Sequence, residues 1–548
     1  MKNCLLVLCL AATAINAKES HVGWLKHYLD KRHFIHALYQ TVVHQLKPLQ
    51  ESIVTILEGN NQVWPQNHEY QKRMAFAHVT QKYEISEQER DFIYLRTKYI
   101  QDKLQQKFDR PVDIKAVPKI GFCFSGGGFR AMVASLGFLR GAQSAGLIDC
   151  CTYMAGLSGS TWAIAPWIAS GKDITTYIDE LHTKIENGIT PLYKPWQVKQ
   201  VCDSLITKMF NKQLLSTVDI YGPLLANTLL ADLGENSITH TFTKTHKRVK
   251  KGIYPLPIYT ALATNKDPYE WIEFSPFHIQ NCSNAPFVSI PTWSFGRSFK
   301  KGISQNFSKE QSLGYFLGIY GSAFGVDMHD IIQILNATIS TIEMQLPDGT
   351  AHYLQRVLQT LADGPLDEMR LIPSMLPNFM YQLANSRFEE HKRLTLVDAG
   401  IDFNLPIAPL LNTARDLDII IVYDASTTVK NGKHLLRAAR YAQVHELPFP
   451  SLTNKPLGKE LITVLKDESN PQAPIIIYIP RITNAMYNIF DPEQHMPNGF
   501  CGTLNFTYSA EQINLLAGLS TFTVQQQSDV IYDVIKEVID QKTSQLTA

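Results

Sequence analysis

The sequence predicts an α/β protein with a parallel-sheet core, helical insertions and a helical N-terminal region. A short apolar segment at 120–124 leads into a glycine-rich turn and then a helix with one apolar face. A second apolar segment at 153–155 leads into another turn and helix. Two strands joined by a helix form a βαβ unit, whose strands lie parallel in one sheet.

Three later apolar segments predict further strands of this sheet. They span residues 394–397, 417–423 and 475–479, and the first two end at Asp398 and Asp424. Short apolar runs bounded by turn residues are typical of strands buried on both faces. We therefore expect a single large sheet in the second part of the chain.

The chain before this core has a helical pattern. Ser86 and Glu89 have the spacing of a capping box, which predicts the start of a charged helix running to about Asp109. We divide the chain into a signal peptide at 1–17, a helical N-terminal region at 18–117 and one large α/β domain at 118–548.

The composition excludes partners that are recognised by charge alone. The 51 Lys+Arg and 50 Asp+Glu residues give a formal net charge of +1. Such a chain has no excess positive charge to attract nucleic acid or an anionic membrane. After the N-terminus no uninterrupted apolar run is long enough for a transmembrane helix. We expect no nucleic-acid partner and no transmembrane segment.

The first 17 residues have the pattern of a secretory signal. Lys2 gives a basic start, residues 5–15 are mostly apolar, and the small residues Ala14 and Ala17 follow. The apolar stretch is shorter than the ~20 residues that a membrane-spanning helix needs. A buried N-terminal strand or helix is the alternative. We expect a secreted or extracytoplasmic protein.

The glycine-rich turn at 125–128 predicts an anion-binding loop. Its glycines leave backbone N–H groups uncovered at a helix N-terminus, and in an ester hydrolase these groups bind the oxyanion. Gly126, Gly128 and Ala131 also fit a dinucleotide fingerprint, but the acidic residue expected after the next strand is absent. An NTPase phosphate loop would need Gly-Lys-Ser/Thr. A purely structural turn is the remaining alternative.

The motif Gly156-x-Ser158-x-Ser160 predicts a serine nucleophile. It directly follows the second strand, so its turn and the glycine loop should open at the same edge of the sheet. A serine nucleophile needs a base. Asp398 and Asp424 both end strands, and aspartate is also common in ordinary turns. The spacing alone does not choose between them.

Arg130 lies in the first turn of the glycine-loop helix, where a cation opposes the helix dipole. A salt bridge to a nearby carboxylate would explain it. The alternative is that its guanidinium binds a substrate phosphate.

These motifs resemble the catalytic domain of cytosolic phospholipase A2 and of the fungal lysophospholipases (phospholipase B). The resemblance is carried by residues 125–132, 156–162, 397–400 and 404–406. It extends over roughly residues 84–540. It implies a patatin-like fold with a Ser/Asp dyad, and it identifies the domain at 118–548 as catalytic.

The resemblance also implies the roles of single residues. It places the nucleophile at Ser158, the base at Asp398, the oxyanion donors at Gly127 and Gly128, and the phosphate contact at Arg130. Asp398 is thereby favoured over Asp424, although Ala399 stands where the family commonly has Ser or Gly. The N-terminal region lacks the clustered aspartates of a calcium-dependent docking domain. We expect no metal and no cofactor.

The predicted function is that of a secreted phospholipid acyl hydrolase. Its substrate would be a glycerophospholipid or lysophospholipid, reached through transient contact with a lipid interface. A general esterase with a Ser-His-Asp triad is one alternative, with His434, His445 or His495 as the histidine. A non-catalytic lipid-binding secreted protein is another, against which the intact Ser158 and Asp398 argue.

Overall fold

A computed structural model describes residues 76–547, apart from 283–285, 323–373, 497–498, 504 and scattered positions between 191 and 217. The predicted signal peptide and the rest of the chain up to residue 75 lie outside the described residues. Within the described part, no helix is long and apolar enough to cross a membrane.

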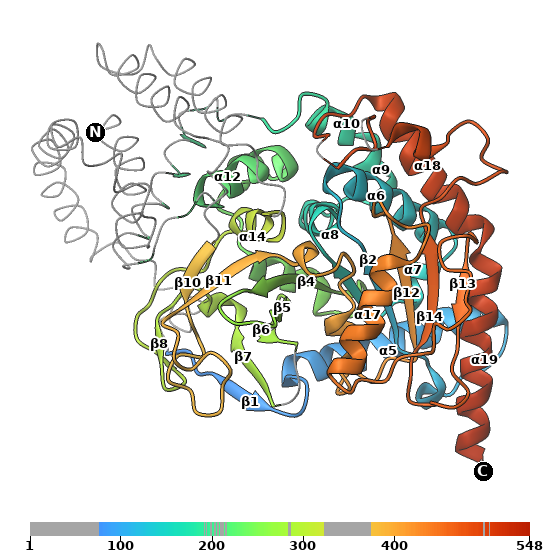
Figure 1. Cartoon of the computed structure of the whole chain (residues 1–548), viewed down its shortest axis with the longest axis horizontal. Helices are drawn as coiled ribbons and strands as arrows, with labels where there is room; N and C mark the ends of the chain where they lie inside the picture. The colour runs from blue at the N-terminus through green and yellow to red at the C-terminus, as the bar shows by residue number, and fades with distance from the viewer. Residues whose placement is uncertain are drawn as a thin grey trace, which may run out of the picture.

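The core is a twelve-stranded sheet whose centre is parallel. Its parallel strands are β2 (Ile120–Phe124), β3 (Tyr153–Gly156), β4 (Leu256–Ala263), β12 (Ile419–Asp424) and β14 (Ile475–Pro480). They lie side by side in the order β4-β3-β2-β12-β14 (Figure 1). The predicted α/β class with a parallel-sheet core is confirmed.

The sheet continues beyond β4 with antiparallel strands that the sequence pattern does not predict. They are β5 (Glu270–Phe274), β6 (His278–Asn281), β7 (Phe287–Pro291) and β1 (Thr80–Lys82). At the sheet margins, β13 (Thr463–Leu465) pairs with β14, and β10 (Ser374–Pro377) pairs with β11 (Arg393–Asp398). β8 (Phe299–Lys300) and β9 (Ile303–Ser304) form a separate pair.

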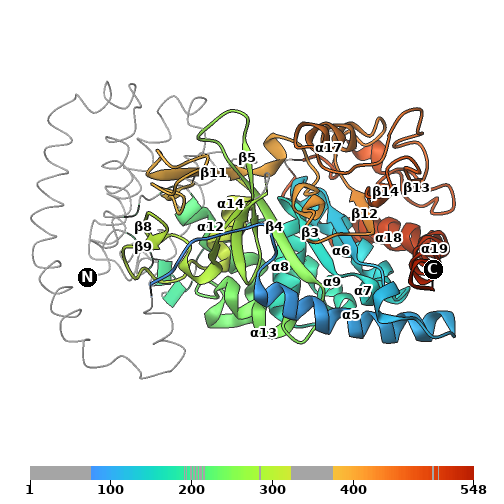
Figure 2. The ribbon, with the colours of Figure 1, turned by 90° about the horizontal axis from the view of Figure 1, so that it is seen from below.

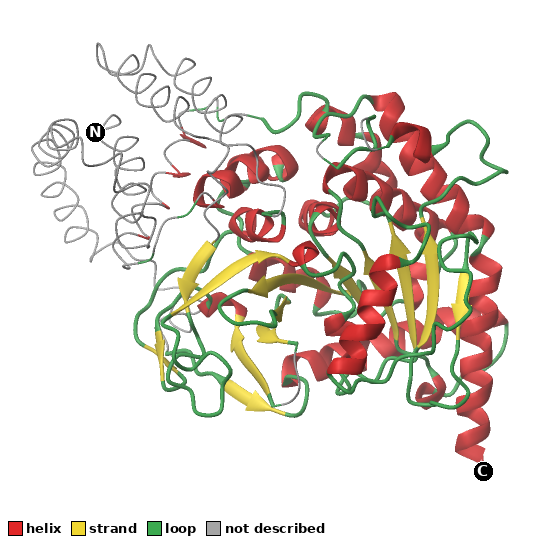
Figure 3. Cartoon of the chain, in the orientation of Figure 1, coloured by secondary structure: helices red, strands yellow, loops and turns green. Residues whose placement is uncertain are grey.

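Helices cover both faces of the parallel strands, as Figures 2 and 3 show. Alternate residues of β12 face different cores. Ile419 and Ile421 belong to the core that includes α6 (Gly128–Ser144), whereas Ile420 belongs to the core that includes α17 (Lys433–Val444). Burial on both faces explains why these strands have continuous apolar sequences.

Other helices surround this core. They are α7 (Leu147–Cys150), α8 (Gly159–Ser170), α9 (Ile174–Asp179), α10 (Leu181–Ile185), α12 (Val218–Leu229), α13 (His246–Val249), α14 (Leu313–Tyr320), α18 (Ala510–Gln526) and α19 (Ser528–Thr547). The last of these buries Ile531, Val534 and Ile535.

The capped N-terminal helix is α5 (Glu87–Phe108). The hydroxyl of Ser86 accepts the backbone N–H of Glu89 at 3.2 Å, as the capping box predicts. The side chain of Glu89 does not complete the box, because it is turned into the core toward Arg415. Further along α5, Arg96 donates to carbonyls of α7 and of the loops before β3 and β4. These contacts fix α5 against the sheet.

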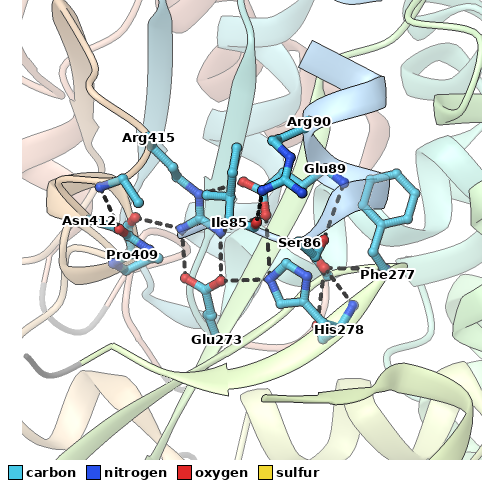
Figure 4. Close-up of polar contacts among 12 residues, drawn as sticks. Ile85, Ser86, Glu89, Arg90, Glu273, Phe277, His278, Pro409, Asn412 and Arg415 are labelled. Carbon is cyan, nitrogen blue, oxygen red and sulfur yellow. Dashed lines mark hydrogen bonds and ion pairs between the residues drawn. The ribbon is translucent and has the colours of Figure 1, made fainter. Parts of the chain in front are cut away.

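A buried charge cluster joins α5 to the antiparallel half of the sheet (Figure 4). Arg415 donates from Nε to Glu89 at 2.8 Å and from Nη1 and Nη2 to Glu273 at 2.7 and 2.6 Å. His278 Nε2 lies 3.2 Å from Glu273 and 3.5 Å from Glu89. Burial alone would raise the pKa of Glu273, but Arg415 and then His278 lower it to about 2. The carboxylate of Glu273 therefore stays ionised inside the core.

Candidate active site

Two strands meet end to end beside β4. β3 pairs with β4 so that Gly156 lies opposite Tyr259, and β11 pairs in the antiparallel sense so that Asp398 lies opposite Ala261. Because β5 occupies the other edge of β4 at both positions, β3 and β11 must share one edge. Ser158 lies two residues beyond Gly156, and Asp398 is the last residue of β11. The register therefore brings Ser158 and Asp398 to the same level.

Ser158 occupies a strained turn between β3 and α8. Its backbone has φ 52° and ψ −121°, which is unusual for a residue other than glycine. Its side chain is fully buried, and within the described residues its Oγ has no hydrogen-bond partner. Ser160 instead accepts the N–H of Leu157 and donates to the carbonyl of Phe124, both at 2.8 Å. Of the two serines in the motif, Ser158 has the uncommitted hydroxyl.

Asp398 is held by its own turn and by a neighbouring loop. Its Oδ1 accepts the N–H of Gly400 at 2.8 Å, and its backbone N–H donates to Ser322 Oγ at 3.0 Å. The side chain is fully buried. Burial, and then the charge of Asp398, raise the pKa of Tyr221 on α12, so this tyrosine also lies close to the carboxylate. The carboxylate is thus fixed in a site shielded from solvent.

The glycine loop lies against the serine turn. Gly127 and Gly128 have φ values of 139° and 62°, which favour glycine. A Cβ atom on Gly159 would lie only 2.9 Å from the nitrogen of Gly128, so the two backbones touch beside Ser158. The structure records no acceptor for the N–H of Gly127 or Gly128 among the described residues. These N–H groups have the surroundings that oxyanion donors require.

Asn404 connects the glycine loop to the turn that follows β11. Its Nδ2 donates to the carbonyl of Gly126 at 2.8 Å and to Ser426 Oγ at 2.6 Å. Its carbonyl accepts the N–H of Gly126 at 3.2 Å. Sequence patterns alone assign Asn404 no role, although its place in the motif at 404–406 is a signal. It positions the loop that lies beside Ser158.

The guanidinium of Arg130 is buried and bound to backbone. Nε donates to the carbonyl of Ala425 at 2.9 Å, and Nη1 donates to the carbonyl of Cys501 at 2.9 Å and to Thr503 Oγ1 at 3.1 Å. Burial, and then the nearby charge of Arg481, lower the pKa of Arg130 to about 10. No carboxylate forms an ion pair with Arg130 in the described part of the chain. The described contacts of Arg130 therefore give the salt-bridge explanation no support.

Comparison with known families agrees with this geometry. Residues 120–440, more than half of the 548-residue chain, match the family model described as the lysophospholipase catalytic domain. The chain belongs to this family. It is 23% identical over 545 residues to mouse cytosolic phospholipase A2 delta. The aligned region covers 85% of this chain and 64% of the mouse protein. The chain thus spans less than two thirds of the mouse protein.

Solved structures show the same fold. Human GIVD cytosolic phospholipase A2 is similar with a TM-score of 0.69 and 21% identity, covering 87% of this chain and 69% of the human chain. The same human enzyme in complex with methyl gamma-linolenyl fluorophosphonate gives a TM-score of 0.66 at 22% identity, covering 85% of this chain and 66% of that chain. The patatin-like fold implied by the resemblance is confirmed.

Within this lysophospholipase-family fold, Asp424, the alternative candidate for the base, has other contacts. It accepts the hydroxyl of Tyr478 at 2.9 Å and the backbone N–H of Ser426 at 3.0 Å. It ends β12, which β2 separates from β3. The strand end that faces Ser158 therefore carries Asp398 and not Asp424.

The three histidines of the esterase alternative also have other contacts. His434 Nδ1 accepts the backbone N–H of Asn404 at 3.1 Å, and burial lowers the pKa of His434. His445 and His495 pack against aromatic rings. In the described part of the chain, no histidine contacts Ser158 Oγ. This family member does not assemble a Ser-His-Asp triad from these histidines.

Proposed function

We propose that the chain hydrolyses fatty acyl esters of glycerophospholipids or lysophospholipids, with Ser158 and Asp398 as a catalytic dyad. The observation that carries this proposal is the end-to-end meeting of β3 and β11, which sets a buried carboxylate at the level of a buried, uncommitted serine hydroxyl. Membership of the lysophospholipase family supports the class of substrate.

In the proposed reaction, Asp398 accepts the proton of Ser158 as its Oγ attacks the ester carbonyl. The N–H groups of Gly127 and Gly128 bind the oxyanion that forms. Asp398 then returns the proton to the leaving glycerol oxygen, which releases a lysophospholipid or a glycerol phosphodiester. Water hydrolyses the acyl-Ser158 ester, with Asp398 again as base, and frees the fatty acid.

Side chains around the dyad fit the two ends of such a substrate. The Phe129 ring lies 5.8 Å from that of Trp162 and 5.4 Å from that of Phe506, forming an apolar wall where the glycine loop meets α8. This wall suits an acyl chain. Arg130 lies directly against the glycine loop, because a Cβ atom on Gly127 would clash with its Nη2, and we assign it to the substrate phosphate. The enzyme would contact the lipid interface only transiently.

The direct test is incubation of the purified protein with diacyl and lyso-phospholipids in the presence of a calcium chelator. We expect fatty acid release that the chelator does not reduce, because the proposed steps use only side chains and backbone N–H groups. Ser158→Ala serves as the control. A non-catalytic lipid-binding protein would bind both lipids and release nothing, and loss of monomeric lysophospholipid turnover in chelator would contradict the metal-free reaction.

We also propose that the protein is secreted, on the strength of the N-terminal pattern. N-terminal sequencing of exported, active protein should find a chain that begins after Ala14 or Ala17. An intact Met1 on that protein would contradict cleavage. Retention of all activity inside the cell would contradict export and agree with the name of the mouse relative.

A further inference from the structure

A second buried arginine lies next to the site, directly after β14. Arg481 is 4% exposed. Its Nη2 donates to the carbonyl of Ser426 at 3.3 Å and contacts Met496 Sδ at 3.0 Å. Its Nε and Nη1 are buried, and no residue in the described part of the chain accepts a hydrogen bond from them. Buried N–H groups of a cation require an acceptor, because leaving them unpaired is costly.

The guanidinium groups of Arg481 and Arg130 donate hydrogen bonds to the carbonyls of two consecutive residues. Arg130 donates to the carbonyl of Ala425, and Arg481 donates to that of Ser426, in the turn that follows β12. The hydroxyl of Ser426 accepts from Asn404, which also binds the glycine loop beside the nucleophile. A short series of contacts therefore connects Arg481 to the proposed oxyanion donors.

The charged side chains at this turn carry a net positive charge, which favours binding of an anion. The proximity of Arg481 contributes to the lowered pKa of Arg130, so the two guanidinium groups lie close together. Among the described residues, Asp424 is the carboxylate that acts on Arg130, and it is bound by Tyr478 and by the backbone of Ser426. Two cations beside one carboxylate leave a single positive charge, which matches a phosphodiester monoanion.

The two arginines differ in the donors that they have left. Arg130 already uses Nε and Nη1 for protein acceptors. Arg481 keeps Nε and Nη1 uncommitted, and a guanidinium presents its N–H groups in a fixed fork that fits phosphate oxygens. Of the two, Arg481 therefore has more donors to offer a phosphate group.

We propose that Arg481 binds the head-group phosphate of the substrate together with Arg130 and makes the site specific for phosphate-bearing lipids. This inference rests on the proposed function, because it names a binding residue for the same reaction. It assigns Arg481 to recognition and leaves bond cleavage to the dyad.

The test measures binding and not turnover. In a Ser158→Ala background, calorimetry compares a short-chain, ether-linked lysophosphatidylcholine with the corresponding alkylglycerol, which lacks phosphate, both below the micellar concentration. Arg481→Gln should weaken binding of the phosphate-bearing ligand by about tenfold or more, since charge-assisted hydrogen bonds are lost. Binding of the alkylglycerol should change by less than about twofold.

Two further variants separate recognition from structure. Arg481→Lys keeps the charge without the fork and should give an intermediate affinity for the phosphate ligand. Met496→Leu removes the sulfur contact but leaves the guanidinium, and should leave both affinities unchanged. Equal weakening of both ligands by Arg481→Gln, an unchanged affinity for the phosphate ligand, or no binding of either ligand to the parent protein would overturn the proposal. Failure of the proposed function would instead appear as wild-type protein that releases no fatty acid, whatever the affinities.

Discussion

Ser158→Ala and Asp398→Asn should each reduce hydrolysis of a soluble lysophospholipid by about 10⁴-fold or more, as loss of a nucleophile or its base does in other serine hydrolases. Ser158 provides the only hydroxyl that the proposed reaction uses, and the amide of an asparagine cannot accept its proton. Both substitutions change the size of a buried side chain very little, so thermal unfolding should stay close to that of the wild type. The measurement is kcat for each purified variant.

Histidine variants are the matched controls for this prediction. His434→Ala, His445→Ala and His495→Ala should each keep most of the wild-type activity, because none of these side chains contacts Ser158 in the described structure. If one of them matched the loss at Ser158 while remaining folded, the dyad would be wrong and a triad esterase would replace it.

Arg415→Met should destabilise the fold by about 3–5 kcal/mol, which is the usual cost of leaving buried charges without their partner. The variant leaves the carboxylates of Glu89 and Glu273 in a core where both are fully buried. Arg437→Met is the matched control, since Arg437 is 46% exposed in its ion pair with Asp402. It should cost less than about 1 kcal/mol. Urea unfolding of both variants gives the two free energies, and equal losses would contradict a structural role for the buried cluster.

The same buried charge cluster predicts how the free energy of unfolding depends on pH in the acidic range. The pKa of Glu273 in the folded protein is about 2, below its ordinary value, so its ionised form stabilises the fold. This contribution is complete above the pKa of the unfolded chain, about 4.3 for glutamate, and is lost as the pH falls from there toward the folded value. The free energy of unfolding of the wild type should therefore fall steeply in this range. Glu273→Gln should fall less steeply, and an identical slope would count against the ionised carboxylate.

The sequence predicted the parallel half of the fold because local patterns encode it. β2 and β14 are buried on both faces, so their sequences are continuous apolar runs that need no knowledge of their neighbours. The turn that carries Ser158 was also visible, since a strand, a glycine and a serine are adjacent in the chain.

The antiparallel strands, the buried charge cluster and the position of Arg481 depend on contacts between segments that are distant in the sequence. A strand sequence does not specify the direction of its neighbour, so the antiparallel approach of β11 to β4 was not predictable. β5 and β6 bury Glu273 and His278, which interrupt the apolar pattern, and Arg415, the partner of Glu273, lies far along the chain. Arg481 is a single charge after an apolar strand, and only the fold places it beside Arg130.

Covalent labelling is the sharpest test of Ser158 as nucleophile and Asp398 as base. A methyl acyl fluorophosphonate loses fluoride when a nucleophilic serine attacks its phosphorus, and the adduct can be located by mass spectrometry of proteolytic peptides. We expect one adduct, on Ser158, with labelling abolished in Ser158→Ala, strongly slowed in Asp398→Asn and unaffected in His434→Ala. An adduct on another residue, or labelling that persists in Ser158→Ala, would contradict it.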